Sequence, residues 1–398
     1  MLESKVYRIY QICQIIDGDR GKNYPKDSDF YENGHCLFLN AGNVTKNGWN
    51  FDNIQFITEE KDAILRKGKL SREDIVMTTR GTVGNFTIFD KKVPYPNLRI
   101  NSGMVIIRPS EKIDKYFLLF LFQSSYIQNT IKLFCSGSAQ PQLPIKDFCK
   151  IKLSIPSFLT QRKIANILSA YDNLIENNNR RIRILEQIAE NLYKEWFVRF
   201  RFPGYETAEF ENGLPKGWEI KKFGNTSKIS SGGDAPKEYS SVRTQDYSIP
   251  VYSNGIANDG LYGFISQGVK GIKSSKSITI SARGTVGFVC LRFEPYLPIV
   301  RLLTIEPDSK VVDVYYLYYM LKEKNIDGYG TSQQQITIPY FSKKKILIPP
   351  VVLQKKYSDF VSDVFMQINK IKEKNENLIK QRDMLLPRLL SGKLGVKE

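Results

Sequence analysis

Met77-Thr78-Thr79-Arg80-Gly81-Thr82-Val83-Gly84 recurs about half a chain length later as Ile280-Ser281-Ala282-Arg283-Gly284-Thr285-Val286-Gly287. A second pair of segments keeps the same order, because Ile155-Pro156 precedes Gln161-Arg162-Lys163 and Ile348-Pro349 precedes Gln354-Lys355-Lys356. Two copies are too few for a solenoid, which needs at least about three stacked repeats. The sequence therefore predicts two similar halves in a pseudo-two-fold molecule that meets its partner at two equivalent places.

Each half begins with short strands and ends with a long helix. Met104-Val105-Ile106-Ile107 and Ser277-Ile278-Thr279-Ile280 are typical strand segments, and turns rich in glycine, proline and asparagine separate such segments. One helix is predicted inside each globular part, near residues 115–133 and 313–324. The predicted boundaries are a first globular domain at 1–156, a long helix at 157–203, a second globular domain at 204–349 and a second long helix at 350–398.

The two long helices carry a heptad pattern over more than four heptads, which is typical of a coiled coil. A 36-residue helix from Gln161 to Trp196 would be about 54 Å long at 1.5 Å per residue. Pro387 is expected to kink or end the second helix. Polar residues within the apolar positions, Asn178 in the first helix and Asn375 and Arg382 in the second, are expected to fix the register. The predicted helix-pairing residues are Leu168, Tyr171, Ile175, Ile182, Leu185, Leu192, Val361, Val364, Ile368, Ile371, Leu378 and Leu385.

Pairing of the two helices with each other is the simplest interpretation of these patterns, since each helix needs a partner and the chain is internally repeated. Packing of each helix on its own globular domain is the alternative.

The charge balance indicates a polyanionic partner. The chain has 58 Lys and Arg against 41 Asp and Glu, a net charge of +17, and both halves share the excess. An evenly basic globular protein is first a candidate nucleic-acid binder and second a membrane-surface binder. Charge that serves solubility alone is the alternative.

Several classes of protein are disfavoured by what the sequence contains. A single histidine, His35, and no Cys-x-x-Cys leave a zinc site short of ligands. Gly18-Asp19-Arg20-Gly21-Lys22 lacks the spacing and the hydroxyl of a P-loop. Neither an adenine-methyltransferase tetrapeptide nor a nuclease-like carboxylate set is recognisable. The five cysteines show no paired spacing and are expected to be reduced thiols of a cytoplasmic protein. No apolar run is long enough to span a bilayer, and residues 1–5 open no signal segment.

Two repeated constellations are candidate DNA contacts. In each Arg-Gly-Thr-Val-Gly turn the glycine allows close approach to a phosphate, and the arginine could hold a phosphate or the O6 and N7 atoms of guanine. A glycine hairpin with a locally packed arginine is the alternative. The loops Ser136–Gln142 and Gly330–Gln335 combine small hydroxyls with glutamine, and lysines follow each loop. The candidate DNA-binding residues are Thr78, Thr79, Arg80, Gly81, Thr82, Ser136, Gly137, Ser138, Gln140, Gln142, Ser281, Arg283, Gly284, Thr285, Thr331, Ser332, Gln333, Gln334, Lys343 and Lys344.

With these motifs the chain resembles the specificity subunit of type I restriction–modification enzymes. The resemblance is carried by the repeated turn, the two polar loops, each Ile-Pro before a Gln-led helix, and the central run Leu168-Ser169-Ala170-Tyr171-Asp172-Asn173-Leu174-Ile175. Ala189-Glu190-Asn191-Leu192-Tyr193-Lys194-Glu195-Trp196 and Gln381-Arg382-Asp383-Met384-Leu385-Leu386-Pro387 also fit. The second helix departs from the pattern, since Arg382 lies among its apolar positions and 357–367 lacks the Leu-Ser-Ala-Tyr-Asp run of the first.

The resemblance implies an α+β fold of two target-recognition domains joined by two helices that pair as an antiparallel coiled coil. Each domain would read one half of a bipartite double-stranded DNA target, and the helices would set the unread gap. The helices would also dock methyltransferase subunits, two in number, which use S-adenosylmethionine. Restriction subunits that use ATP and Mg would join the same complex. No catalytic residue, metal or cofactor is expected in this chain.

Other functions remain open at this point. A specificity subunit of a type IIB-like system would keep the architecture with a different cutting partner. A catalytic nuclease or methyltransferase, a coiled-coil scaffold that never meets DNA, and a membrane-associated protein are the other classes.

Overall fold

The computed structural model describes residues 4–46, 48–137, 141–273, 276–324, 326 and 335–395. The chain divides into two compact units. Unit 1 holds residues 1–178 and 373–398, and unit 2 holds residues 179–372. Each unit therefore contains one globular part together with portions of both long helices.

A four-stranded antiparallel sheet organises unit 1, with strand order β2-β10-β7-β8. Successive side chains of a strand point to opposite faces of the sheet, and both faces of this sheet are covered. Ile75 and Met77 of β7 pack in one apolar cluster with helix residues such as Phe117, whereas Val76 packs in another cluster with Leu37. This two-sided burial explains why three consecutive residues of β7, Ile75, Val76 and Met77, are apolar. The four strands are β2 (Cys13–Asp17), β7 (Ile75–Thr78), β8 (Phe86–Ile88) and β10 (Met104–Pro109).

Smaller sheets and five short helices complete the globular part of unit 1. In the three-stranded sheet, β3 pairs antiparallel with β6 and parallel with β9. Strand β1 pairs with β11, immediately before the first long helix. These elements are β1 (Ser4–Arg8), α1 (Ile9–Ile12), β3 (Cys36–Leu39), β4 (Val44–Thr45), β5 (Gly48–Trp49), β6 (Phe56–Ile57), α2 (Glu59–Ile64), β9 (Leu98–Ile100), α3 (Lys115–Gln123), α4 (Ser125–Phe134), α5 (Ile145–Lys150) and β11 (Lys152–Pro156).

Unit 2 repeats this topology. Its four-stranded sheet has the order β15-β21-β18-β19, and β16 pairs antiparallel with β17 and parallel with β20. Strand β14 pairs with β22 just before the second long helix, as β1 pairs with β11. The internal repeat predicted from two motifs therefore extends to the strand pairings. The elements are β12 (Phe210–Glu211), β13 (Leu214–Pro215), β14 (Glu219–Lys222), β15 (Ser227–Ser231), β16 (Ile249–Tyr252), β17 (Leu261–Ile265), β18 (Ser277–Ile280), β19 (Val289–Arg292), β20 (Leu297–Pro298), β21 (Leu303–Pro307), α7 (Val314–Glu323), α8 (Ile338–Lys343) and β22 (Lys345–Ile348).

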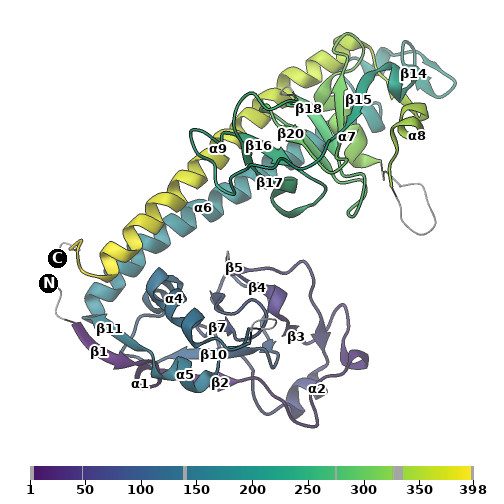
Figure 1. Cartoon of the computed structure of the whole chain (residues 1–398). Helices are drawn as coiled ribbons and strands as arrows, with labels where there is room; N and C mark the ends of the chain where they lie inside the picture. The colour runs from purple at the N-terminus through teal and green to yellow at the C-terminus, as the bar shows by residue number, and fades with distance from the viewer. Residues whose placement is uncertain are drawn as a thin grey trace. The chain divides into compact units, whose positions relative to one another are not determined.

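The long helices are α6 (Phe158–Tyr193), which continues as a π-helical turn over Lys194–Val198, and α9 (Val351–Leu390). Within each unit, portions of α6 and α9 lie side by side (Figure 1). In unit 1 Asp172 contacts Arg382 and Asn178 contacts Asn375. Residue numbers therefore increase along α6 in the direction in which they decrease along α9. The pairing is antiparallel, and the predicted α+β fold of two similar β-rich domains with two paired long helices is confirmed.

One detail of the predicted helices was wrong. The single helix expected over 115–133 is two helices, α3 and α4, because Ser124 adopts an extended backbone and caps α4 through its hydroxyl. Of the two outcomes expected at Pro387, a kink or an end, the end does not occur there, since α9 continues to Leu390. A proline three residues from a helix end removes one backbone hydrogen bond, and Leu389 is buried with Leu168 in the core of unit 1.

One glutamine at the start of each long helix ties that helix to its domain. The buried Gln161 accepts a hydrogen bond from the backbone N of Asp114 (2.8 Å) and donates to the carbonyl of Pro156 (3.0 Å). In unit 2, Gln354 accepts from Asp313 N (2.7 Å) and donates to Pro349 O (2.7 Å). The Gln noticed as a repeated motif is therefore a structural anchor.

Candidate DNA-recognition site

The repeated turn has one geometry in both units. In unit 1, the backbone N of Gly84 donates to Thr78 O (3.0 Å) and Val83 N donates to Gly81 O (3.0 Å). In unit 2, Gly287 N donates to Ser281 O (2.9 Å) and Val286 N donates to Gly284 O (3.0 Å). These four bonds close the same turn at the end of β7 and at the end of β18.

Glycine is required at two positions of this turn. Gly81 and Gly84 have φ values of +72° and +86°, and Gly284 and Gly287 have +71° and +87°. Side chains with a Cβ rarely adopt this left-handed backbone. Open space surrounds Gly81 and Gly284, so another molecule can approach the backbone there.

Arg80 and Arg283 are the exposed charges of the two turns. Within the described part of the chain, neither guanidinium has an acidic side chain as partner. Both arginines are therefore exposed and without an acidic side-chain partner, and their contact with a phosphate or a base edge stays a prediction.

The residue that follows the second repeated motif is hydrogen-bonded to the turn in each unit. Leu143 N donates to Thr79 O (3.0 Å), and Ile336 N donates to Ala282 O (3.1 Å). In unit 1 the loop is closed at its base by reciprocal bonds between Ser136 and Gln142. In unit 1 the two motifs, which are some sixty residues apart in the sequence, thus form one surface. In unit 2, residues 330–334 of the second motif lie outside the described residues.

The structure corrects part of the predicted contact set. The side chains of Thr78 and Ser281 are buried, and the Thr78 hydroxyl is bonded within the turn to Thr82 O and Asn85 N. The Thr78 hydroxyl thus shapes the turn, and neither of these two side chains is exposed to solvent. Thr79 is also almost fully buried, and it meets solvent only where it lines a cleft.

The remaining predicted contacts are accessible or lie outside the described residues. Ser138, Gln140, Thr331, Ser332, Gln333 and Gln334 fall outside them. Exposed or half-exposed positions are Arg80, Gly81, Thr82, Ser136, Gly137, Gln142, Arg283, Gly284, Thr285, Lys343 and Lys344.

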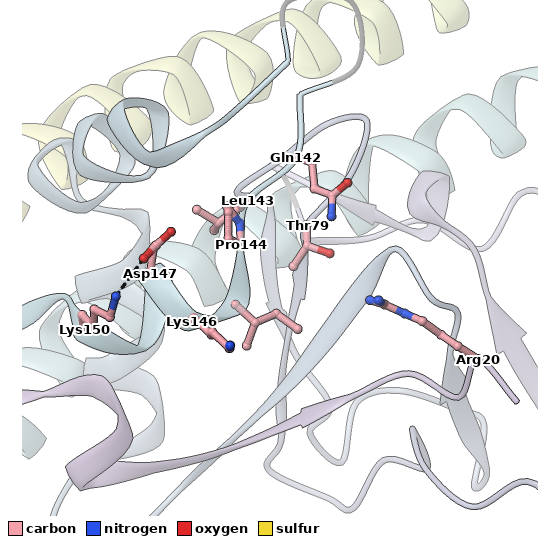
Figure 2. A pocket seen from close by; sticks show the side chains of 9 residues that line it. Arg20, Thr79, Gln142, Leu143, Pro144, Lys146, Asp147 and Lys150 are labelled. Atoms are coloured by element: carbon pink, nitrogen blue, oxygen red, sulfur yellow. Dashed lines mark hydrogen bonds and ion pairs between the residues drawn. The ribbon is translucent and has the colours of Figure 1, made fainter.

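A cleft of about 280 Å³ opens beside the turn of unit 1 (Figure 2). Arg20 reaches into it from the loop after β2, and Lys146 and Lys150 line it from α5. Its remaining lining residues are Thr79, Gln142, Leu143, Pro144, Ile145 and Asp147.

The loop that carries Arg20 is fixed by the neighbouring carboxylate. Asp19 is 6% exposed and accepts hydrogen bonds from the backbone N of Gly21 (2.8 Å) and of Arg66 (2.8 Å). These backbone bonds lower the pKa of Asp19 below its usual value. The charged Asp19 carboxylate therefore fixes the backbone of the loop that carries Arg20.

Sequence reasoning missed three side chains of these surfaces. Arg20 was considered only within an incomplete P-loop. Gln128 supports the first turn by donating to Gly84 O (3.0 Å), and Asn254 supports the second by accepting from Ala282 N (2.8 Å). All three come from elements distant in sequence, so no local pattern marks them.

The predicted helix-pairing residues are all buried or half-buried. Val361 and Ile368 pack with Ile182 in the core of unit 2, together with sheet residues such as Ile280. Both interpretations of the heptads therefore hold, because the helices pack on each other and on the domain. Leu168, Ile182, Val361, Val364, Ile368 and Ile371 are buried, and Tyr171, Ile175, Leu185, Leu192, Leu378 and Leu385 are half-buried.

Asn178 and Asn375 meet directly. The Nδ2 of Asn178 donates to Oδ1 of Asn375 at 2.7 Å, and both side chains are buried. Arg382 bonds Asp172 of the other helix at 2.6 Å. The polar interruptions of the two heptad patterns are thus complementary.

The described residues contain no cluster of three His, Cys, Asp or Glu side chains able to hold a metal ion. None of the helices in the described ranges is long and apolar enough to traverse a bilayer.

Comparisons with known proteins agree with this geometry. Residues 1–187 and 215–381 match the model of the type I restriction modification DNA specificity domain. The chain is 29% identical to the type I restriction enzyme MjaIX specificity subunit of Methanocaldococcus jannaschii, covering 98% of this chain and 90% of that protein. It is 24% identical to the HindI specificity subunit of Haemophilus influenzae, covering 95% and 98%. The crystal structure of the type I restriction–modification S subunit from M. genitalium shares the fold, with a TM-score of 0.57, 17% identity and coverage of 98% and 96%.

Proposed function

We propose, because this chain belongs to the family of type I restriction–modification DNA specificity subunits, that each of its two domains reads one half of a bipartite DNA target. The chain is the recognition subunit of such a system, and catalysis belongs to its partner subunits. The proposed recognition domains are residues 1–156 and 204–349, and residues 157–203 and 350–398 are the proposed spacer.

The observation that carries this proposal is the duplicated surface. Each domain presents an exposed arginine on an open glycine turn, and the residue after the polar motif, Leu143 or Ile336, donates a hydrogen bond to that turn. Arginine is the residue most often used to read guanine, and backbone approach through glycine favours phosphate contact. Two copies of one surface on a chain of net charge +17 fit a duplex with two half-sites.

The helices serve two roles in this proposal. Their paired length sets the number of unread base pairs, and their exposed faces bind two methyltransferase subunits. Exposed apolar side chains support the docking role, since Leu174 and Ile184 of α6 and Phe360 and Met366 of α9 are 48%, 51%, 48% and 52% exposed. Restriction subunits then join the same complex.

A modification map tests the proposal. The chain is co-expressed with the methyltransferase subunit of its own operon in an unmodified host, and methylated adenines are located by long-read sequencing. We expect one split motif for the unchanged chain. Arg80→Ala and Arg283→Ala are each expected to relax or abolish a different half of that motif, because each removes the charge of one domain.

The control is Lys91→Ala, an exposed charge at the other end of the β7–β8 pair. It should leave both halves unchanged. Loss of the same half in both arginine variants, or of neither half, would contradict the assignment of one reader to each domain.

A further inference from the structure

We propose that the cleft of unit 1 binds a backbone phosphate of the DNA, and that the second domain lacks the equivalent site. This inference rests on the proposed function and deepens it. It assigns Arg20 and Lys146 to affinity and leaves sequence reading to the repeated turn and loop.

The cleft is built for an anion. Arg20 projects toward Thr79 and Gln142 from the loop after β2, and Lys146 lines the cleft from α5 (Figure 2). A cationic pair with a neighbouring hydroxyl and amide supplies the charge and the donors that phosphate oxygens accept. The anchored Asp19 keeps the Arg20 loop in this position before any ligand arrives.

The charges of the cleft do not cancel one another. Lys150 is paired with Asp147 at 3.1 Å, and Arg20 contacts Asp17 at 3.2 Å with both side chains partly exposed. Lys146 is exposed, and no acidic side chain of the described residues pairs with it. One positive charge is thus left over beside the surface that is proposed to meet DNA.

The position of the cleft identifies the anion as part of the DNA. The backbone of Gln142 forms an isolated antiparallel β-bridge with that of Arg80, the proposed reader of this domain. The cleft therefore adjoins the reading surface, and a duplex seated there presents phosphates to it. Contacts to phosphate fix the register of a protein on a duplex without carrying sequence information.

Strand register shows what replaces the cleft in unit 2. Cys13 pairs with Pro109 in unit 1, and Ser227 pairs with Pro307 in unit 2, so the two strands begin at equivalent positions. Counting seven residues onward from each start places Arg20 of unit 1 at the position of Asp234 in unit 2.

The helix that follows the polar loop is also less basic at the equivalent position in unit 2. Aligning Gln142-Leu143 with Gln335-Ile336 places Lys146 at the position of Pro339 and Asp147 at that of Tyr340. At the positions of Arg20 and Lys146 the second domain thus has one acidic and one neutral residue, and Lys343, at the position of Lys150, is the cation that the two domains share. A phosphate would meet repulsion from Asp234 there.

The test uses the complex of the full chain with its methyltransferase subunit. Lys146→Gln and Arg20→Gln, singly and together, are compared with Lys91→Gln, which removes an exposed charge of the same domain away from the cleft. The affinity for a duplex carrying the mapped motif, and for the same duplex with either half scrambled, is measured from 50 to 300 mM NaCl.

Each cleft variant is expected to weaken binding about fivefold at 0.15 M salt, because each phosphate contact contributes about 0.9 to the slope of log affinity against log salt. The loss should be the same whichever half is scrambled, the slope should fall by about one, and the methylated motif should be unchanged. Lys91→Gln should match the unchanged chain.

The outcomes separate this inference from the proposed function. A change in the methylated motif would make the cleft a reader of bases and overturn the phosphate assignment. Unchanged affinity and slope, or an equal loss in Lys91→Gln, would overturn it as well while leaving the split motif intact. An unchanged chain that yields no split motif would overturn both proposals.

Discussion

At the scale of single residues, the two halves of the chain share anchors as well as candidate contacts. Asp114 caps α3 by accepting from the backbone N of Tyr116 and of Phe117, and Asp313 caps α7 by accepting from Tyr315 and Tyr316. The backbone N of each capping aspartate donates in turn to the glutamine that opens a long helix. One side chain thus couples the helix to the cap of a domain helix.

We expect Gln161→Ala to destabilise unit 1 by about 1–3 kcal/mol, because it leaves the partly buried N–H of Asp114 without its acceptor. Hydrogen–deuterium exchange should rise at the start of α3, and the thermal midpoint should fall. Gln354→Ala should do the same at the start of α7. The matched control is Gln187→Ala, which changes an exposed glutamine of the same helix. Equal effects of Gln161→Ala and Gln187→Ala would show that the anchor contributes nothing.

At the scale of elements, sequence patterns predicted what is periodic or local. The heptads of α6 and α9, the strands β10 and β18 and the helix α7 follow from patterns within one segment. The burial of Thr78 and the part played by Arg20 depend on residues brought together by the sheet. Arg20, for example, bonds Ser102 O, which lies 82 positions away. Such contacts leave no trace in a local pattern, so the anion cleft was not predictable.

The buried Asn178–Asn375 pair is expected to fix helix register at some cost in stability. Asn178→Leu alone should destabilise unit 1 by about 1–3 kcal/mol, since the buried Oδ1 of Asn375 loses the hydrogen bond from Asn178. The double change Asn178→Leu with Asn375→Leu should recover or exceed the original stability, because two apolar groups then meet. Thermal unfolding of both single variants and the double variant forms a double-mutant cycle that measures the coupling.

The same variants also test the register role. The double variant should methylate its split motif with a less uniform gap, whereas a sharp gap of unchanged length would show that other contacts fix the register. The pair Arg382–Asp172 is the next candidate for that role, since it crosses between the same two helices.

At the scale of the whole molecule, the two domains are joined by elements that belong to both units. Helices α6 and α9 each contribute residues to unit 1 and to unit 2. A change of helix length must therefore alter the relation between the two proposed reading surfaces without altering either surface. The target should respond in its gap and not in its halves.

We expect insertion of four residues after Asn179 in α6, together with four after Lys372 in α9, to lengthen the gap by one or two base pairs. The insertion adds about 6 Å and about 40° beyond a full turn to each helix. One base-pair step of DNA advances by about 3.4 Å and turns by about 34–36°. The longer helices therefore separate and rotate the two domains by amounts that correspond to one or two extra base pairs. Methylation mapping should show both halves unchanged around the longer gap.

The control places the same four residues at Asn212-Gly213, the exposed tip of the β12–β13 hairpin. That chain is expected to keep the original gap. Insertion into only one of the two helices should instead abolish methylation, because Asn178 and Asn375 and the apolar positions beyond them would no longer face each other on both sides of the insertion. An unchanged gap in the doubly extended chain would mean that the paired helices do not measure the target, and the spacer role would then pass to the DNA or to the bound methyltransferases.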